Sequence, residues 1–121
     1  MHKILIVDDD VTITELMEAL LTMEGYQPTT VNDSPKALEA ANSINPDLIV
    51  LDLMMPGLTG FELCELLQQN PKVASIPILI VSARDDPESK QRAMQCGARE
   101  YITKPFEVDH LLQKIHDMID S

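Results

Sequence analysis

The sequence predicts an α/β domain in which short apolar strands alternate with amphipathic helices. Three runs, Ile4–Val7, Leu48–Leu51 and Ile78–Val81, consist entirely of aliphatic residues, most of them β-branched. Such runs are typical of strands that are buried on both faces of a parallel sheet. The segments between the runs have helical periodicity, and strict alternation of the two favours βαβ units. Right-handed crossovers then place helices on both faces of the sheet.

Turn and capping residues set the expected bounds of the elements. Gly25 ends the first helix, and Ser34-Pro35 supplies an N-cap followed by a proline at the first helical position. Asp86-Pro87 repeats that signal, and Pro56-Gly57 indicates a turn. The expected strands are 3–7, 27–31 (an edge strand), 48–51, 78–81 and 100–102, and the expected helices are 11–24, 34–43, 61–69, 87–96 and 107–119.

Apolar spacing predicts which side of the first helix and of the last helix is buried. The fourth helix differs from the others, because Glu88–Gln95 carries few large apolar side chains, which permits a loosely held helix. The expected inner stripes are Ile13, Leu16, Met17, Leu20 and Leu21 in the first helix, and Val108, Leu111, Leu112, Ile115 and Ile119 in the last.

Length and charge limit the class of function. A chain of 121 residues with 45% hydrophobic content is expected to form one globular domain, spanning residues 1–121. Its net charge of −11 argues against direct binding of nucleic acid, which needs clustered lysine and arginine. No apolar stretch is long enough for a membrane span, and no signal peptide is evident, so we expect a cytoplasmic location without membrane attachment.

The cysteines and histidines do not form a recognisable metal motif. Cys64 and Cys96 are expected to be small, buried or half-buried residues in a reducing compartment. His2, His110 and His116 are dispersed along the chain and are expected to lie at the surface.

Two of the apolar runs end in carboxylates. Asp8-Asp9-Asp10 follows the first run, and Asp52 follows Leu48–Leu51. Because the carboxyl ends of parallel strands share one edge, where open α/β sheets bind their ligands, these acids are expected to gather there. A carboxylate cluster needs a cation or a raised pKa to be tolerated. Oxygen ligands without histidine or cysteine suit Mg²⁺.

Further residues at the same edge point to phosphoryl transfer. Ser82 ends the third apolar run, and Lys104 follows the expected last strand. A lysine there is a mobile charge that could reach a phosphoryl oxygen, and Asp52 is the candidate nucleophile. Each residue alone also has an ordinary interpretation. Asp10 is better explained as a helix-start residue, and Asp8 and Asp9 alone could equally be so.

Four motifs in this order resemble the receiver domain of two-component response regulators, over essentially the whole chain. They are Asp8-Asp9, Asp52-Leu53-Met54-Met55-Pro56-Gly57, Val81-Ser82-Ala83, and Gly97-Ala98 with Tyr101 to Lys104-Pro105-Phe106. The resemblance implies a flavodoxin-like (CheY-like) doubly wound sheet of five parallel strands in the order 2-1-3-4-5, with five helices on both faces. It also implies a phosphorylation-activated switch in place of an enzyme with a separate substrate.

The resemblance assigns roles to single residues. Asp52 would accept a phosphoryl group from a histidine kinase or a histidine phosphotransfer protein. Asp9, Asp52 and the backbone carbonyl of Met54 would bind Mg²⁺, with Asp8 helping through water. Lys104, joined to Pro105 by a cis bond, would contact the phosphoryl oxygens.

The same resemblance implies a switch. Ser82 would bind the phosphoryl group while Tyr101 turns inward, and the face of helix four, strand five and helix five would signal to a downstream partner or effector domain.

The sequence departs from the family pattern at a few positions, and two other functions compete with that of a receiver. Arg99-Glu100 and His110 stand where regulators that dimerise through this face carry acids, and Ser82 replaces a commoner threonine. One alternative is a phosphorylation-independent interaction module with the same fold, although such relatives usually lose the acceptor, an acid of the pair or the lysine. A flavin-binding protein would need a phosphate loop where Asp8-Asp9-Asp10 stands. The chain ends at Ser121, so a stand-alone regulator and an excised receiver both remain open.

Overall fold

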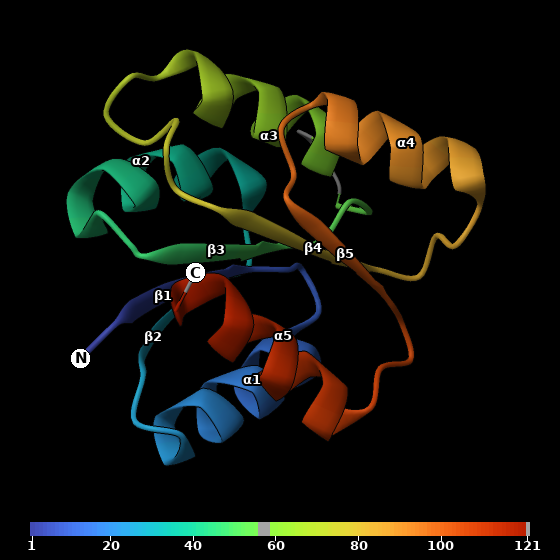
Figure 1. The fold of residues 1–121 in the computed structure, drawn as a ribbon. Coiled ribbons are helices and arrows are strands. Elements are labelled where there is room, and N and C mark those ends of the chain that lie inside the picture. The colour runs from blue at the N-terminus through green and yellow to red at the C-terminus, as the bar shows by residue number, and fades with distance from the viewer. Residues whose placement is uncertain (56–58, 121) are drawn as a thin grey trace.

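A computed structural model of the chain, which describes residues 1–55 and 59–120, contains one sheet of five parallel strands. The strands are β1 (Lys3–Val7), β2 (Gln27–Val31), β3 (Leu48–Leu51), β4 (Ile78–Ser82) and β5 (Glu100–Thr103). Their order across the sheet is β2-β1-β3-β4-β5, as predicted (Figure 1). β2 lies at the edge, which agrees with its half-buried side chains.

Five helices cover the two faces of the sheet within the described residues. They are α1 (Val11–Met23), α2 (Ser34–Ile44), α3 (Gly60–Gln69), α4 (Pro87–Gln95) and α5 (Val108–Asp120). α1 and α5 lie on one face, and α2, α3 and α4 lie on the other (Figure 1). Throughout residues 1–55 and 59–120, each helix is too short or too polar to cross a membrane.

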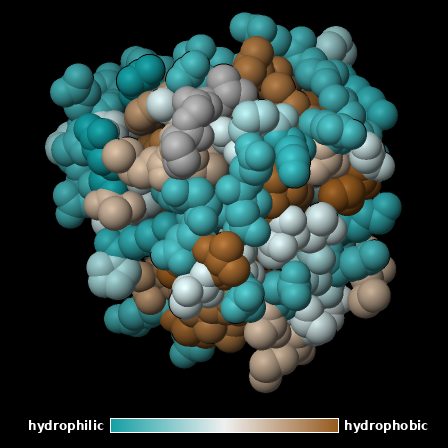
Figure 2. All heavy atoms as spheres, turned by 180° about the vertical axis from the view of Figure 1, so that it is seen from behind, coloured by the Kyte–Doolittle hydropathy of each residue, from teal (hydrophilic) through white to brown (hydrophobic). Residues whose placement is uncertain are grey.

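The sheet separates the core into two clusters because successive strand residues point to opposite faces. Leu5 and Val7 pack with residues of α2, α3 and α4, whereas Ile4 and Ile6 pack with those of α1 and α5. Both faces of the three central strands are therefore buried, which explains why their sequences are apolar without interruption. Hydrophilic residues cover most of the molecular surface seen from behind (Figure 2).

Several sequence-based bounds and faces differ from the structure. Asp33, not Ser34, is the N-cap of α2, although it makes no side-chain cap bond, and Pro35 is the second helical residue instead of the first. Leu16 and Val108, predicted as buried, are 43% and 39% exposed. The Pro56-Gly57 turn prediction and Ser121 lie outside the described residues.

Parallel register aligns the strand ends that bear the predicted site. Val7 pairs with Leu51, Leu51 with Ile80, and Ser82 with Thr103. The residues that follow these positions therefore emerge at one edge of the sheet, as the sequence predicted.

Candidate functional site

Three carboxylates meet at the carboxyl edge of β1 and β3. Asp8 follows β1 and Asp52 follows β3, and one carboxylate oxygen from each of Asp8, Asp9 and Asp52 lies within 4.8 Å of the others. Asp8 and Asp52 are only 2% and 5% exposed, whereas Asp9 is exposed. Two buried acids and one exposed acid thus form a cluster that reaches the surface at Asp9.

Backbone groups fix the orientation of the two buried carboxylates. Asp8 Oδ1 accepts a hydrogen bond from the Asp10 N–H at 2.9 Å, and Asp52 Oδ1 accepts one from the Met54 N–H at 3.3 Å. Asn32 Nδ2 donates to the carbonyl oxygen of Asp8 at 2.9 Å and so holds the chain there from β2. The second oxygen of each carboxylate, Oδ2, faces the ammonium group of Lys104.

Asp10 has the helix-start role that its position predicted. Its Oδ1 accepts hydrogen bonds from the N–H groups of Thr12 and Ile13, at 3.0 and 3.3 Å, at the N-cap of α1. A capping oxygen of this kind satisfies amides that the helix itself cannot pair. Asp10 therefore does not belong to the carboxylate cluster, and Asp8 and Asp9 do.

Lys104 extends from the end of β5 into the cluster. Its Nζ lies 2.7 Å from Asp8 Oδ2 and 3.6 Å from Asp52 Oδ2. The Lys104-Pro105 peptide bond is cis, as expected. The lysine side chain is 18% exposed, so its ammonium balances part of the negative charge in a largely water-excluded place.

The cluster perturbs the titration of its members. Burial, followed by the charge of Asp8, raises the pKa of Asp52 to about 6, and Lys104 only partly opposes this. Burial lowers the pKa of the Lys104 ammonium, but its hydrogen bond to Asp8 and the charge of Asp52 outweigh burial and raise that pKa overall. The surroundings of Asp52 therefore disfavour its ionised form.

The donor set fits a hard divalent cation. Three carboxylates offer oxygen atoms within 4.8 Å of one another, one from each, and the described surroundings supply no imidazole or thiolate at the cluster. Mg²⁺ binds through one or two carboxylates and retains several waters, for which the exposed side at Asp9 leaves room. A cation here would also reverse the effect that raises the pKa of Asp52.

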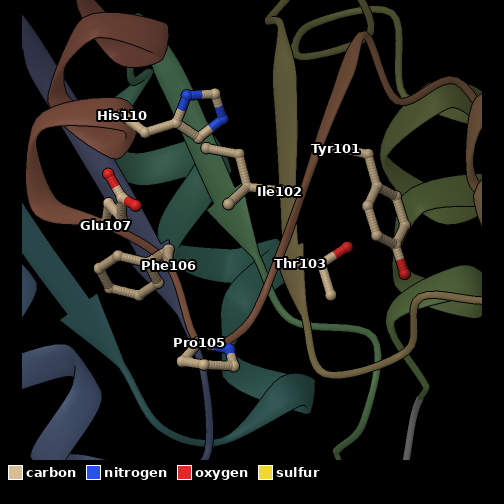
Figure 3. A pocket seen from close by; sticks show the side chains of 7 residues that line it. All are labelled: Tyr101, Ile102, Thr103, Pro105, Phe106, Glu107 and His110. Atoms are coloured by element: carbon tan, nitrogen blue, oxygen red, sulfur yellow. The ribbon is translucent and has the colours of Figure 1, made fainter.

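Ser82 and Tyr101 are joined through the backbone of Arg84. Ser82 is fully buried, and its Oγ accepts a hydrogen bond from the Arg84 N–H at 3.2 Å. The Tyr101 hydroxyl donates to the carbonyl oxygen of the same residue. Tyr101 and Thr103 point to the side of β5 away from α5, whereas Ile102 points toward α5 (Figure 3). One residue of the loop after β4 thus contacts both predicted switch side chains.

Sequence reasoning missed Arg84 and Asn32. The Arg84 guanidinium lies 3.4 Å from Asp86 Oδ1 and 3.9 Å from Met54 Sδ, so it connects the N-cap of α4 to the loop after Asp52. The only sequence feature that could have indicated a role for Arg84 is its position two residues after Ser82. No sequence feature indicated a role for Asn32.

The cysteines and the histidines have the burial that the sequence predicted. Cys64 and Cys96 are buried free thiols, as expected, and His2, His110 and His116 are exposed. Glu100, one of the residues that depart from the family pattern, pairs with Lys114 within the chain at 3.1 Å. Its charge is thus already partnered inside the domain.

Comparison with known proteins identifies the class. The family model described as "Response regulator receiver domain" matches residues 4–116, and this chain belongs to that family. The fold, the acid cluster and the family together make it a receiver domain of two-component signalling systems.

Relatives and solved structures agree with this assignment. The chain is 37% identical over 119 residues to the DNA-binding dual master transcriptional regulator RpaA of a Synechocystis strain, covering 98% of this chain and 49% of the relative. It is 36% identical over 116 residues to the response regulator PleD of Caulobacter vibrioides, covering 96% of this chain and 26% of PleD. The chain thus spans half or less of the length of these curated relatives. The chemotaxis protein CheY4 of Vibrio cholerae superposes with a TM-score of 0.93 at 32% identity, covering 98% of both chains.

Proposed function

We propose that residues 1–121 form a receiver that accepts a phosphoryl group on Asp52 in a Mg²⁺-dependent reaction. The observation that carries the proposal is the convergence of three carboxylates and the Lys104 ammonium in one cluster. A purely structural ion pair would not need three acids, of which two are almost completely buried. All residues that the phosphorylation-independent alternative usually loses are present, so that alternative has less support.

The residues divide the work of the transfer. A carboxylate oxygen of Asp52 attacks phosphorus, so that a new P–O bond forms as the bond from phosphorus to the donor breaks. Asp9, Asp52 and the Met54 carbonyl are proposed to hold Mg²⁺, and Asp8 to assist through water. When bound, Mg²⁺ neutralises charge on the phosphoryl oxygens. Lys104 contacts one of those oxygens once it leaves Asp8 and Asp52.

The proposed output follows from Ser82 and Tyr101. Ser82 Oγ donates its hydroxyl proton to the phosphoryl group, and the movement of Ser82 toward that group shifts the Arg84 N–H, which donates to the same Oγ. Tyr101 responds because its hydroxyl is bonded to the Arg84 carbonyl. The loop before α4 then shifts, and the face of α4, β5 and α5 changes its contacts with a partner.

The proposed partners act in the cytoplasm. A histidine kinase or phosphotransfer protein donates the phosphoryl group, and an effector responds to the switched domain. RpaA is described as DNA-binding, but this chain matches about half of it. With a net charge of −11, the domain itself is not proposed to bind nucleic acid. The chain acts as a switch and has no separate substrate to turn over.

Incubation with acetyl phosphate and Mg²⁺, followed by intact mass measurement, tests the proposal. The protein should gain the mass of one phosphoryl group, and chelation of Mg²⁺ should abolish the gain. Asp52→Asn should not react. Asp10→Asn is the matched control, because it removes a neighbouring charge but keeps a good N-cap residue, and it should react normally.

Failure of the unaltered protein to gain mass, and to respond to beryllofluoride with Mg²⁺, would favour the phosphorylation-independent interaction module. Phosphorylation of Asp52→Asn at the wild-type rate would show that another residue is the acceptor.

A further inference from the structure

Helix α4 has few contacts that fix its position. Only Ser89 and Ala93 are buried among its nine residues, and neither has a large side chain. Arg92, an exposed residue of α4, adds a contact with α3. The carbon at the centre of the Arg92 guanidinium lies 4.1 Å from the centroid of the Phe61 ring.

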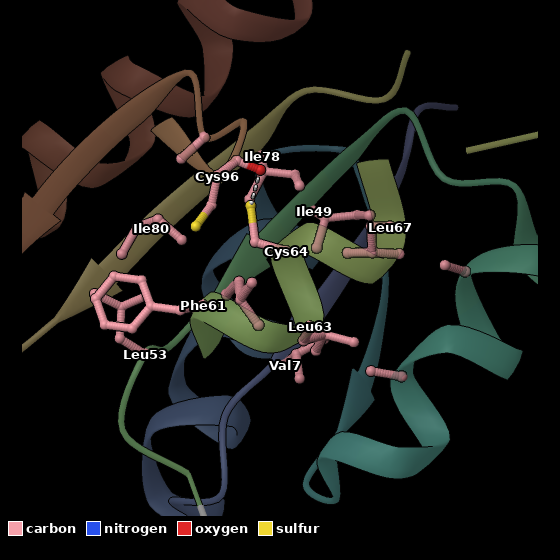
Figure 4. Close-up of a cluster of buried hydrophobic side chains, with 14 of the residues drawn as sticks. Val7, Ile49, Leu53, Phe61, Leu63, Cys64, Leu67, Ile78, Ile80 and Cys96 are labelled. Atoms are coloured by element: carbon pink, nitrogen blue, oxygen red, sulfur yellow. Dashed lines mark hydrogen bonds between the residues drawn. The ribbon is translucent and has the colours of Figure 1, made fainter. Parts of the chain in front are cut away.

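Phe61 is a firm support for this contact. It is the second residue of α3, is 7% exposed, and belongs to the same core cluster as Leu53 (Figure 4). The buried Phe61 ring lies against the guanidinium of the exposed Arg92, which gives a cation–π contact of the strength typical of a surface site. The capping box of Thr59 and Glu62 fixes the turn on which Phe61 lies.

The same turn is in direct contact with the proposed acceptor. Gly60 donates its N–H to the carbonyl oxygen of Leu53 at 3.0 Å. A Cβ at Gly60 would collide with the backbone of both Asp52 and Leu53, so the two segments touch without an intervening side chain. Asp52 and Leu53 thus pack directly against Gly60, which precedes Phe61, and Arg92 connects Phe61 to α4.

We infer that Arg92 is a positioning residue that, through the Phe61 ring, couples the backbone at Asp52 to the placement of α4. This route differs from the one through Ser82 and Tyr101, because it passes along α3 and not along the loop after β4. It rests on the proposed function, since it concerns how occupancy of Asp52 reaches α4.

The second route has a physical rationale in the small buried face of α4. A helix with weak packing has several positions of similar energy, so one well-placed contact decides among them. A second cation of α4 also approaches an aromatic ring, but at a longer distance. Lys90 Nζ lies 5.9 Å from the centroid of the Tyr101 ring in β5. Arg92 therefore provides the stronger of these two attachments.

Amide hydrogen exchange of the full chain, with and without beryllofluoride and Mg²⁺, tests the inference. Arg92→Gln removes the cation and keeps a polar side chain, and should speed exchange in 87–95 by roughly fivefold without changing exchange in α5. Beryllofluoride should change α4 exchange less in Arg92→Gln than in the unaltered protein. Arg92→Lys should restore part of the response.

Two further variants distinguish coupling between Asp52 and α4 from a simple loss of positive charge at Arg92. Phe61→Leu keeps a large apolar side chain without the aromatic face and should reproduce the effect of Arg92→Gln, and the double variant should add little. Arg99→Gln removes a nearby charge just after α4 and should behave as wild type. If Phe61→Leu unfolds the protein, the inference is still tested by comparing the α4 exchange response of Arg92→Lys with that of Arg92→Gln.

The outcomes for this inference and for the proposed function are distinguishable. No beryllofluoride response in the unaltered protein contradicts the proposed function. A normal response in that protein together with an equal α4 response in Arg92→Gln contradicts the Arg92 inference alone.

Discussion

Helices α4 and α5 precede and follow the same strand, β5, but they are attached to the sheet in different ways. α5 buries Leu111, Ile115 and Met118, whereas α4 buries only Ser89 and Ala93. A large aliphatic side chain contributes about 1.5–3 kcal/mol on burial, and a small one contributes much less. The helix nearest the Arg84 loop is therefore the one that can move at low energetic cost, and α5 is a fixed reference.

Truncation of α5 should have the largest effect on this comparison. Leu111 is fully buried, so Leu111→Ala should destabilise the whole domain by about 2–4 kcal/mol through lost transfer energy and an unfilled cavity. Urea unfolding followed by circular dichroism measures this. Ala93→Gly in α4 should cost about 1 kcal/mol; equal costs for the two variants would remove the distinction between the helices.

Neutralising Asp52 should stabilise the metal-free domain. Its folded-state pKa of about 6 lies above the ordinary value of 3.8, so the folded protein holds the proton more tightly, and above pH 6 the ionised acid opposes folding. At pH 7.5, Asp52→Asn should raise stability by about 1–2 kcal/mol, or roughly 3–8 °C in Tm. The gain should shrink as pH falls from 6 toward 4.

Thermal unfolding with a chelator measures this effect, and Mg²⁺ provides the control. Added Mg²⁺ should stabilise the unaltered protein and leave Asp52→Asn nearly unchanged, because the variant lacks one proposed ligand. A lower Tm for Asp52→Asn at pH 7.5 without Mg²⁺ would show that the acid cluster is not under electrostatic strain.

Removing the N-cap of α4 should loosen that helix locally. Asp86 accepts a hydrogen bond from the Ser89 N–H, which together with other bonds lowers the pKa of Asp86 to about 2. Asp86→Ala should speed amide exchange in α4 roughly fivefold and leave α5 unchanged. Because the pKa is lowered, the cap stabilises above about pH 3.8 and is lost as pH falls toward 2.

Asp109→Ala is a matched control for Asp86→Ala, since Asp109 lies in the first turn of α5. Its effect on α4 exchange should be absent. Equal acceleration by both variants would indicate global unfolding in place of local opening.

The smallest effect is expected at Val108, which the sequence wrongly placed on the buried side of α5. It is 39% exposed, so Val108→Ser should change stability by less than about 0.5 kcal/mol in urea unfolding. A loss of stability approaching that of Leu111→Ala would show that Val108 contributes to the buried side of α5, as the sequence predicted.

The strands and the gathering of the acids were predictable because both depend on local pattern and parallel register. Apolar runs as uniform as Ile4–Val7 admit few alternatives, and strand ends such as Asp8 and Asp52 share an edge in any parallel sheet. Helix faces were less certain, because periodicity does not give the width of the buried stripe. Hence Leu16 was wrongly included and Met118 was overlooked.

Contacts between separate helices were beyond the sequence. The approach of Arg92 to Phe61 depends on how α3 and α4 pack, and the Arg84 contacts depend on the path of a loop. Lys104 was predicted at the site, but its bond to Asp8 was not, since that geometry depends on how the chain leaves β5.

One measurement tests the central claim that occupancy of Asp52 repositions α4 against a fixed α5. Amide exchange or NMR shifts should be recorded for the unaltered protein and Asp52→Asn, before and after addition of beryllofluoride with Mg²⁺. We expect a clear change in 87–95, a smaller change at the buried positions of α5, and no change in Asp52→Asn. Equal changes in both helices, or a response that persists in Asp52→Asn, would contradict it.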